Sequence, residues 1–183
     1  PIFFYSFQEI PLIYHHKGYF LEAIKEYRRA LKLDPDNRDI RLNIAQTLLL
    51  SGNMVEGWRE YEARLEDPKI IAKRCRFPGE PWAGQSINNK KIIVWCEQGL
   101  GDMLQFVRYL EPLVERTAEI ILVCPERLIR LFSKSNFLVK IISDEGPFPN
   151  AAYNVPIMSL PYFLRTQNIP TYSPYLFAED SLV

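Results

Sequence analysis

The spacing of apolar side chains changes about one third of the way along the chain. Up to residue 66, apolar residues recur at intervals of three and four, which is the period of a helix with one buried face. One such stripe consists of Leu21, Ile24, Tyr27, Ala30 and Leu31, and a second of Leu42, Ile44, Ala45, Leu48 and Leu49. This part of the chain is therefore predicted to be helical.

The two helical stretches are copies of one pattern. Four pairs of identical residues lie 34 positions apart: Gly18 and Gly52, Glu22 and Glu56, Tyr27 and Tyr61, and Leu31 and Leu65. Each glycine is expected to end the first helix of its pair, where a left-handed residue is favoured. The run 34–36, Asp-Pro-Asp, is expected to end the second helix and to cap the next one. A 34-residue period with these residue types resembles the tetratricopeptide repeat.

The first repeat departs from this pattern at its start. Pro11 falls inside the predicted first helix, where a proline costs about 3 kcal/mol. Stable arrays need about three repeats because each repeat buries its face on the next, and residues 1–66 hold one good repeat and one damaged one. Either the array is cut at its N-terminus or its helices dock on the following domain. We favour a cut, which the missing initiator Met also suggests.

The periodicity stops between residues 67 and 90. This stretch contains three prolines and two glycines, namely Pro68, Pro78, Pro81, Gly79 and Gly84. A linker built for flexibility would carry serine and glycine rather than Phe77 and Trp82. We therefore predict an ordered connector in which Trp82 packs against one of the domains.

Beyond residue 90, short apolar runs alternate with helical patterns. Strands are predicted at residues 91–95, 119–123 and about 138–143, and helices at about 102–116 and 125–134. Continuous apolar strands predict a parallel sheet that is covered on both faces. Pro112 predicts a kink or an early end in the first of these helices. Residues 153–178 suggest two short strands around one weak helix.

These patterns predict a chain of class α followed by α/β. Tetratricopeptide-like helices, the first repeat degenerate or truncated, are expected over residues 1–66 and an ordered linker over residues 67–90. A Rossmann-like parallel α/β domain is expected over residues 91–183. The two parts are predicted to be separate domains because their hydrophobic periods differ.

Composition and charge narrow the range of partners and compartments. The 22 basic and 22 acidic side chains cancel and form no basic block, so nucleic acid is not expected as a partner. No apolar run approaches the roughly 20 residues of a membrane span, and the N-terminus lacks the basic region of a signal peptide. The three cysteines, Cys75, Cys96 and Cys124, are far apart and form no metal-binding pair. We therefore expect a cytoplasmic protein without disulfides, metal or cofactor.

The residues that follow the first predicted strand carry the candidate chemistry. After Trp95 the chain reads Cys-Glu-Gln-Gly-Leu-Gly-Asp, and an apolar-periodic segment follows. Parallel α/β domains build ligand sites with such strand–glycine turn–helix units, at the carboxyl ends of their strands. The turn also places two carboxylates, Glu97 and Asp102, at the mouth of the expected site.

Two familiar nucleotide motifs do not fit this turn. A P-loop requires Gly-Lys-Ser/Thr, whereas Gly101 is followed by Asp102 and Met103. A dinucleotide fingerprint requires a third glycine at position 104, which is Leu104, and an acid after the second strand, where Cys124 stands. The turn is therefore not expected to bind nicotinamide or flavin cofactors.

A family resemblance gives the turn a chemical role. The run EQGLGDMLQFVRYL, preceded by PWAG and followed by SLP, IP and PYL, resembles bacterial tetratricopeptide proteins with a heptosyltransferase-like glycosyltransferase domain of the two-lobed GT-B fold. The resemblance implies that residues 91–183 are the N-terminal, acceptor-binding lobe and that a second lobe binds the nucleotide sugar. It implies that Asp102 is the general base, which takes a proton from an acceptor hydroxyl, and suggests that Glu97 positions the acceptor.

The turn itself supplies the remaining candidate contacts. Gln98, Gly99, Leu100 and Gly101 are expected to bind substrate, and the backbone N–H groups of the last three are available to anionic groups at the helix N-terminus. Asp102 has a second possible role, because it stands where a helix N-cap belongs and Gln105 completes a capping box. A base and a cap are compatible roles for one aspartate.

The chain lacks part of what the resemblance requires. No second lobe follows before Val183, so this fragment alone is expected to be inactive. The alternative function is a non-enzymatic adaptor, in which the repeats bind a protein or peptide and the α/β domain is a scaffold.

Overall fold

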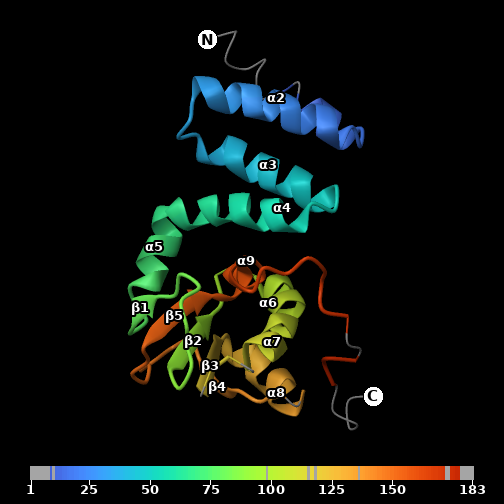
Figure 1. Ribbon diagram of the computed structural model, residues 1–183. Coiled ribbons are helices and arrows are strands. Elements are labelled where there is room, and N and C mark those ends of the chain that lie inside the picture. The colour runs from blue at the N-terminus through green and yellow to red at the C-terminus, as the bar shows by residue number, and fades with distance from the viewer. Residues whose placement is uncertain are drawn as a thin grey trace. The chain divides into compact units, whose positions relative to one another are not determined.

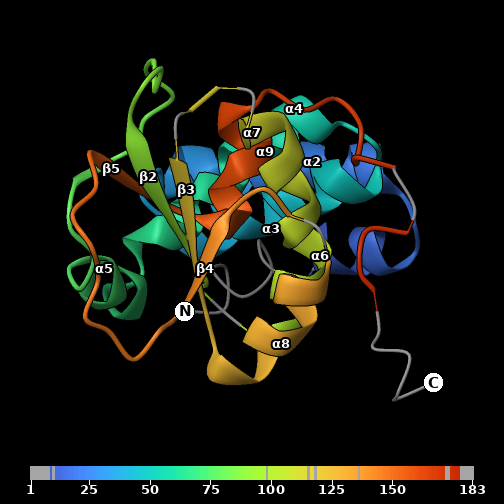
Figure 2. The ribbon, with the colours of Figure 1, turned by 90° about the horizontal axis from the view of Figure 1, so that it is seen from below.

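The computed structural model describes residue 9 and residues 11–97, 99–114, 116–117, 119–135, 137–171 and 174–177. It divides into two compact units. The helical unit comprises residues 1–70 with 165–168, and the α/β unit comprises residues 71–164 with 169–183. Figures 1 and 2 show the elements of each unit, which are considered separately below.

The helical unit consists of helices that pack on their neighbours in sequence. Residues 11–16 are helical, and the elements that follow are α2 (Phe20–Leu33), α3 (Arg38–Leu50), α4 (Met54–Tyr61) and the 3₁₀ helix η1 (Glu62–Glu66). Helix α3 packs against both α2 and α4 (Figure 1). Gly18 and Gly52 have φ values of 78° and 86°, so both predicted left-handed helix ends are confirmed.

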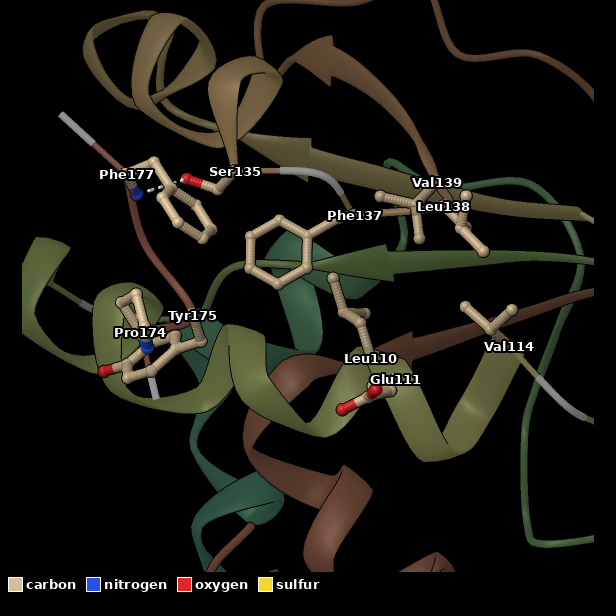
Figure 3. Close-up of a pocket in the computed structure, with 10 residues that line it drawn as sticks. All are labelled: Leu110, Glu111, Val114, Ser135, Phe137, Leu138, Val139, Pro174, Tyr175 and Phe177. Atoms are coloured by element: carbon tan, nitrogen blue, oxygen red, sulfur yellow. Dashed lines mark hydrogen bonds between the residues drawn. The ribbon is translucent and has the colours of Figure 1, made fainter. Parts of the chain in front are cut away.

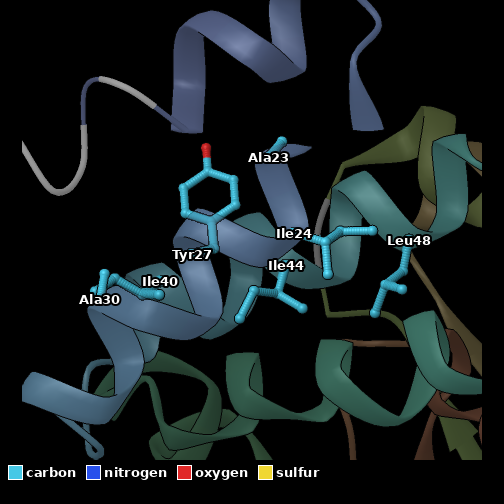
Figure 4. Close-up of a cluster of buried hydrophobic side chains, with 7 residues drawn as sticks. All are labelled: Ala23, Ile24, Tyr27, Ala30, Ile40, Ile44 and Leu48. Atoms are coloured by element: carbon cyan, nitrogen blue, oxygen red, sulfur yellow. The ribbon is translucent and has the colours of Figure 1, made fainter. Parts of the chain in front are cut away.

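The core of the helical unit follows the predicted stripe with one exception. Ile24, Tyr27 and Ala30 are buried and meet Ile44 and Leu48 of α3 (Figure 4). The prediction for Leu21 is wrong, because this side chain is 79% exposed. At about 100° per residue, a spacing of three turns Leu21 about 60° away from Ile24, on the side opposite to Tyr27.

The start of α3 also differs from its prediction. The expected cap in the run 34–36 is wrong, because the N-cap residue is Asn37, whose side-chain oxygen accepts a hydrogen bond from the N–H of Ile40 at 3.0 Å. Asp34 instead ends α2 and accepts a hydrogen bond from the Asn37 amide at 2.8 Å. The aspartate therefore supports the capping residue without capping the helix itself.

The connector predicted over residues 67–90 contains regular structure. Helix α5 (Pro68–Arg74) spans the division between the units, and β1 (Glu80–Pro81) joins the sheet of the α/β unit. Trp82 is buried and its ring lies 5.1 Å from that of Phe163, so its predicted packing is confirmed. The strand was missed because two residues that include a proline carry no apolar period, and its place at the sheet edge tolerates that proline.

The α/β unit is built on a five-stranded, all-parallel sheet with the order β1-β5-β2-β3-β4. Its other strands are β2 (Lys91–Trp95), β3 (Glu119–Cys124), β4 (Lys140–Ser143) and β5 (Tyr153–Pro156). The side chains of the central strands β2 and β3 are almost entirely buried, as the continuous apolar runs predicted. Helices α6 (Leu100–Phe106) and α8 (Glu126–Lys134) lie on one side of the sheet (Figure 2).

The segment predicted as a single helix over 102–116 is broken into three pieces. Helix α6 ends at Phe106 and is followed by the 3₁₀ helix η2 (Val107–Leu110) and by α7 (Glu111–Val114). The predicted early end is confirmed, because Pro112 has no N–H to offer to the carbonyl of Arg108.

The C-terminal region was only partly predicted. After β5 come the 3₁₀ helix η3 (Ile157–Ser159) and α9 (Leu160–Phe163). The second strand expected after them is wrong for the described residues 169–171 and 174–177, which contain no strand.

Candidate functional site

The glycine turn, residues 97–102, follows β2, which is the strand at which the order of strands in the sheet reverses. From β2 the chain adds β3 and then β4 on one side, and returns to place β5 on the other side of β2. The ends of β2 and β5 are in register, with Trp95 opposite Pro156. In open parallel sheets, ligands bind outside the carboxyl ends of the strands at such a reversal. The fold therefore puts the turn at the position where a ligand is expected.

The helix after the turn begins two residues earlier than predicted. Gly99 is its N-cap residue, with φ −68° and ψ 171°, and Leu100 is its first residue. Asp102 is therefore the third residue of the first turn, and the predicted capping box of Asp102 and Gln105 is wrong. The cap prediction failed because the extended backbone of Gly99, not a side chain, starts this helix.

The Asp102 carboxylate is half-buried and faces the start of the turn. A Cβ atom placed on Gly99 would lie 4.0 Å from its Oδ2. A negative charge in the first turn of a helix is stabilised by the unpaired N–H groups there. Asp102 is therefore not the N-cap residue, and its carboxylate remains partly accessible at the turn.

The two glycines of the turn are not required by the fold. Gly101 is exposed, and a Cβ placed on it would meet no atom of the described residues within 4 Å outside its own helix backbone. Gly99 is also exposed, and its φ is in the ordinary negative range. The chain's other glycines all have a structural reason. Gly57 lies in a tight helix contact. The remaining five have positive φ, namely Gly18, Gly52, Gly79, Gly84 and Gly146.

The other residues that were predicted to contact substrate are Glu97, Gln98 and Leu100. Glu97 is half-buried and follows β2 by two positions, and it interacts with other groups in the structure. Leu100 is half-buried at the first position of α6. Gln98 lies outside the described residues. The turn thus brings Gly99, Gly101 and Asp102 together on one helical turn.

Sequence reasoning assigned no site role to the ends of the neighbouring strands β3 and β4. Cys124, at the end of β3, is buried, and burial raises the pKa of its thiol to about 12, with added contributions from Asp144, Cys96 and Glu126. The thiol therefore stays protonated and is not a nucleophile at neutral pH. Asp144 directly follows β4 and Glu126 begins α8, two positions after β3, so further carboxylates lie at this edge of the sheet. The sequence signal was the position of Asp144 directly after the third predicted strand.

The described residues provide no group of three or more His, Cys, Asp or Glu side chains that is placed to hold a metal ion. Within the same part of the chain, none of the helices has the length and apolar character to cross a membrane.

Comparisons with known proteins identify the repeats. Residues 12–52 match the model of the TPR repeat family, so the predicted tetratricopeptide repeat is confirmed. Protein FlbA of Caulobacter vibrioides (strain ATCC 19089 / CIP 103742 / CB 15) is 39% identical over 71 residues, which are 39% of this chain and 12% of FlbA. The match thus spans only a small part of the length of that curated relative.

Among solved structures, a mutant of Thermobaculum terrenum O-GlcNAc transferase is similar to this chain at 20% sequence identity. The alignment covers 62% of this chain and 29% of that protein, with a TM-score of 0.30. A score of this size does not establish a shared fold. The TPR repeat is therefore the part of the chain that the comparisons identify.

Proposed function

We propose that the α/β unit is the acceptor-side, Rossmann-like lobe of a heptosyltransferase-like GT-B glycosyltransferase. In this proposal residues 1–66 are its tetratricopeptide region and residues 67–90 its ordered linker. The complete protein, acting in the cytoplasm, moves a sugar from a nucleotide sugar to a hydroxyl group of an acceptor. A second lobe binds the nucleotide sugar, and transfer requires both lobes.

The two unexplained glycines carry this proposal. Gly99 and Gly101 lie at the reversal of the sheet, and neither backbone conformation nor packing requires them. A residue without a side chain lets a ligand approach the backbone closely, which is a use of glycine at binding turns. The bare surface of the turn is therefore best explained by a bound molecule.

Asp102 supplies the chemistry next to that surface. The acceptor hydroxyl attacks the anomeric carbon of the donor sugar, and the bond from that carbon to the nucleotide phosphate breaks. The Asp102 carboxylate takes the hydroxyl proton as the new bond forms. The carboxylate is half-buried and is held on the first turn of α6, which keeps it beside Gly99. Glu97, at the end of β2, is assigned to positioning the acceptor.

The test is a transfer assay on the polypeptide of the whole reading frame that contains this chain. Labelled UDP-, GDP-, ADP- and CMP-sugars are supplied separately, and transfer of label is measured. Asp102→Asn keeps the size of the side chain but removes the base, so transfer should fall by about 100-fold or more. Transfer by Asp102→Ala should fall equally. The control Glu80→Gln changes an exposed residue of β1 and should leave transfer unchanged.

Two results would contradict the proposal. Full transfer by Asp102→Asn would exclude the catalytic role of the carboxylate. Absence of transfer from every donor would favour the second candidate function, a protein-binding adaptor that acts through its repeats.

One observation favours the adaptor as second candidate. The helical unit has a hollow of about 690 Å³ whose lining includes Tyr19, Leu21 and Leu50. These three side chains are 55%, 79% and 62% exposed. The ion pair of Arg28 and Glu56 also borders the hollow, so its surface combines apolar and charged groups. Exposed apolar groups with a polar rim are typical of protein-binding surfaces.

A further inference from the structure

The α/β unit has a concave surface that is separate from the glycine turn. It is a pocket of about 280 Å³ between the η2–α7 segment, the residues that link α8 to β4, and the C-terminal segment 174–177 (Figure 3). Leu110, Val114 and Phe137 are among the apolar side chains that line it. The pocket borders the residues that precede β4, whereas the glycine turn follows β2, so the two surfaces belong to opposite ends of the strands.

Polar contacts hold the outer wall of this pocket in place. Arg108 donates hydrogen bonds to the Tyr175 hydroxyl at 2.6 Å and to the Pro170 carbonyl at 3.2 Å. Its guanidinium also lies 4.2 Å from the centre of the Tyr175 ring. Further along, the N–H of Phe177 donates to the hydroxyl of Ser135 at 3.1 Å. These hydrogen bonds hold residues 174–177 in place, and the apolar space beside Leu110 stays open.

The rim of the pocket carries a negative charge. Glu111 is exposed at the first position of α7, beside the apolar floor (Figure 3). No lysine, arginine or histidine of the described residues forms an ion pair with its carboxylate. The rings of Phe137 and Phe177 also face this space, and aromatic faces attract cations. The pocket therefore combines an apolar interior with one carboxylate at its mouth, while the guanidinium of Arg108 is engaged with Tyr175 and the Pro170 carbonyl.

The size of the pocket decides between two kinds of occupant. A stable protein interface covers about 800 Å² on each partner, and a hollow of about 280 Å³ would accommodate a single side chain within such an interface, not a whole protein surface. Small-molecule sites begin at about this volume and are lined by apolar side chains with few polar groups. We propose that this pocket binds a small amphipathic amine, with an aromatic or branched apolar body inside and a protonated amino group at Glu111.

Three indole compounds that differ in charge test this proposal. Tryptamine is cationic, indole-3-ethanol is neutral and indole-3-acetate is anionic, and each is titrated into the ¹⁵N-labelled chain. The amide signals of residues 137–139 and 175 should shift, with dissociation constants in the millimolar range. Tryptamine should bind about two- to five-fold more tightly than the neutral compound, as expected for one exposed ion pair, and the acetate should bind most weakly.

Variants of the rim and of the interior complete the test. Glu111→Gln should make tryptamine and indole-3-ethanol bind equally, whereas the exposed control Glu80→Gln should leave the preference unchanged. Val114→Phe should fill the space and abolish binding of all three compounds. Should that variant misfold, Leu138→Lys is used, because Leu138 is 81% exposed at the rim and a lysine there would compete for Glu111.

Three outcomes would overturn the proposal. The first is no binding of any compound up to about ten times the expected dissociation constant, which would leave a partner's side chain as the alternative occupant. The second is a preference for tryptamine that survives Glu111→Gln. The third is a set of signal shifts that lies outside the pocket residues.

Discussion

The helical unit and the glycine turn of the α/β unit use glycine in different ways. In the helical unit, Gly18 and Gly52 adopt positive φ at helix ends, and Gly57 allows α4 to approach Leu49 of α3. Each of these glycines is required by the fold. In the α/β unit, Gly99 and Gly101 fill no such role. The comparison teaches that glycines for which the fold has no use are the ones to test as a binding site, as proposed for this turn.

The two units also differ in what holds them together. The helical unit has a core of modest size and a chain of surface ion pairs, which includes Arg28–Glu56 and Arg41–Glu66. Such exposed pairs contribute little each. The α/β unit is organised around a parallel sheet whose central strands are buried on both faces. Loss of one apolar side chain should therefore cost most at the centre of the sheet.

The largest effect is expected from Ile93→Ala. Ile93 is fully buried in β2, so the change should lower the free energy of unfolding by about 2–5 kcal/mol, measured by urea titration. The control is Leu21→Ala in the helical unit, whose side chain is 79% exposed and which should change stability by less than about 0.5 kcal/mol. Equal losses would mean that Leu21 belongs to the core after all.

The next effect concerns the glycine in the helix contact. A Cβ on Gly57 would lie 2.8 Å from the Leu49 side chain and 3.1 Å from its backbone nitrogen. Gly57→Val should therefore destabilise the chain by about 1–3 kcal/mol through overpacking. The matched change Gly101→Val, where the space is open, should cost less than about 0.5 kcal/mol. A larger loss at Gly101 than at Gly57 would remove the distinction between structural and site glycines.

Gly101→Ala should have a smaller effect, of opposite sign. Because Gly101 is helical and open, alanine should raise the free energy of unfolding by up to about 1 kcal/mol. Transfer by the polypeptide of the whole reading frame should nevertheless fall, since the methyl group occupies the surface assigned to the ligand. Thermal unfolding and the transfer assay are measured on the same preparation. A stabilised variant with full transfer would show that the bare backbone is not used.

Periodicity predicted the elements that bury an apolar face, because burial is what creates the period. Strand β2 has the predicted bounds, and the first helix of each pair ends at the predicted glycine. Periodicity failed where tertiary contacts decide the structure. The second strand predicted within residues 153–178 is absent from the described residues 169–171 and 174–177, where Pro170 and Tyr175 instead accept hydrogen bonds from Arg108, more than 60 positions away in sequence.

The candidate site was only partly predictable for a related reason. The glycine turn was recognised because its residues are contiguous. The carboxylates near Cys124 come from different strand ends, and the order of strands cannot be read from the residues of one strand. The position of Asp102 within α6 depended on the backbone of Gly99, which has no side chain to signal a helix start.

The smallest effect concerns the pH dependence of stability, which is expected to arise in the helical unit. His15 shares a hydrogen bond of 2.8 Å with the hydroxyl of the buried Thr47, which itself donates to the Asn43 carbonyl, so His15 Nδ1–H is the donor. Burial, and then the charge of His16, lowers the pKa of His15 below its ordinary value of 6.5. The unfolded chain therefore binds more protons, and stability should fall as the pH drops through about 6.5 and level off below the folded pKa.

The variant His15→Asn isolates this contribution from the other titrating groups. Its side-chain amide can still donate to Thr47 but does not titrate, so the urea midpoint should change less between pH 8 and pH 5 than it does for the unaltered chain. The difference belongs to the helical unit, because His15 and Thr47 both lie there. An identical pH dependence for the two proteins would show that burial does not disfavour the charged imidazole, and that the helix at residues 11–16 leaves His15 in contact with water.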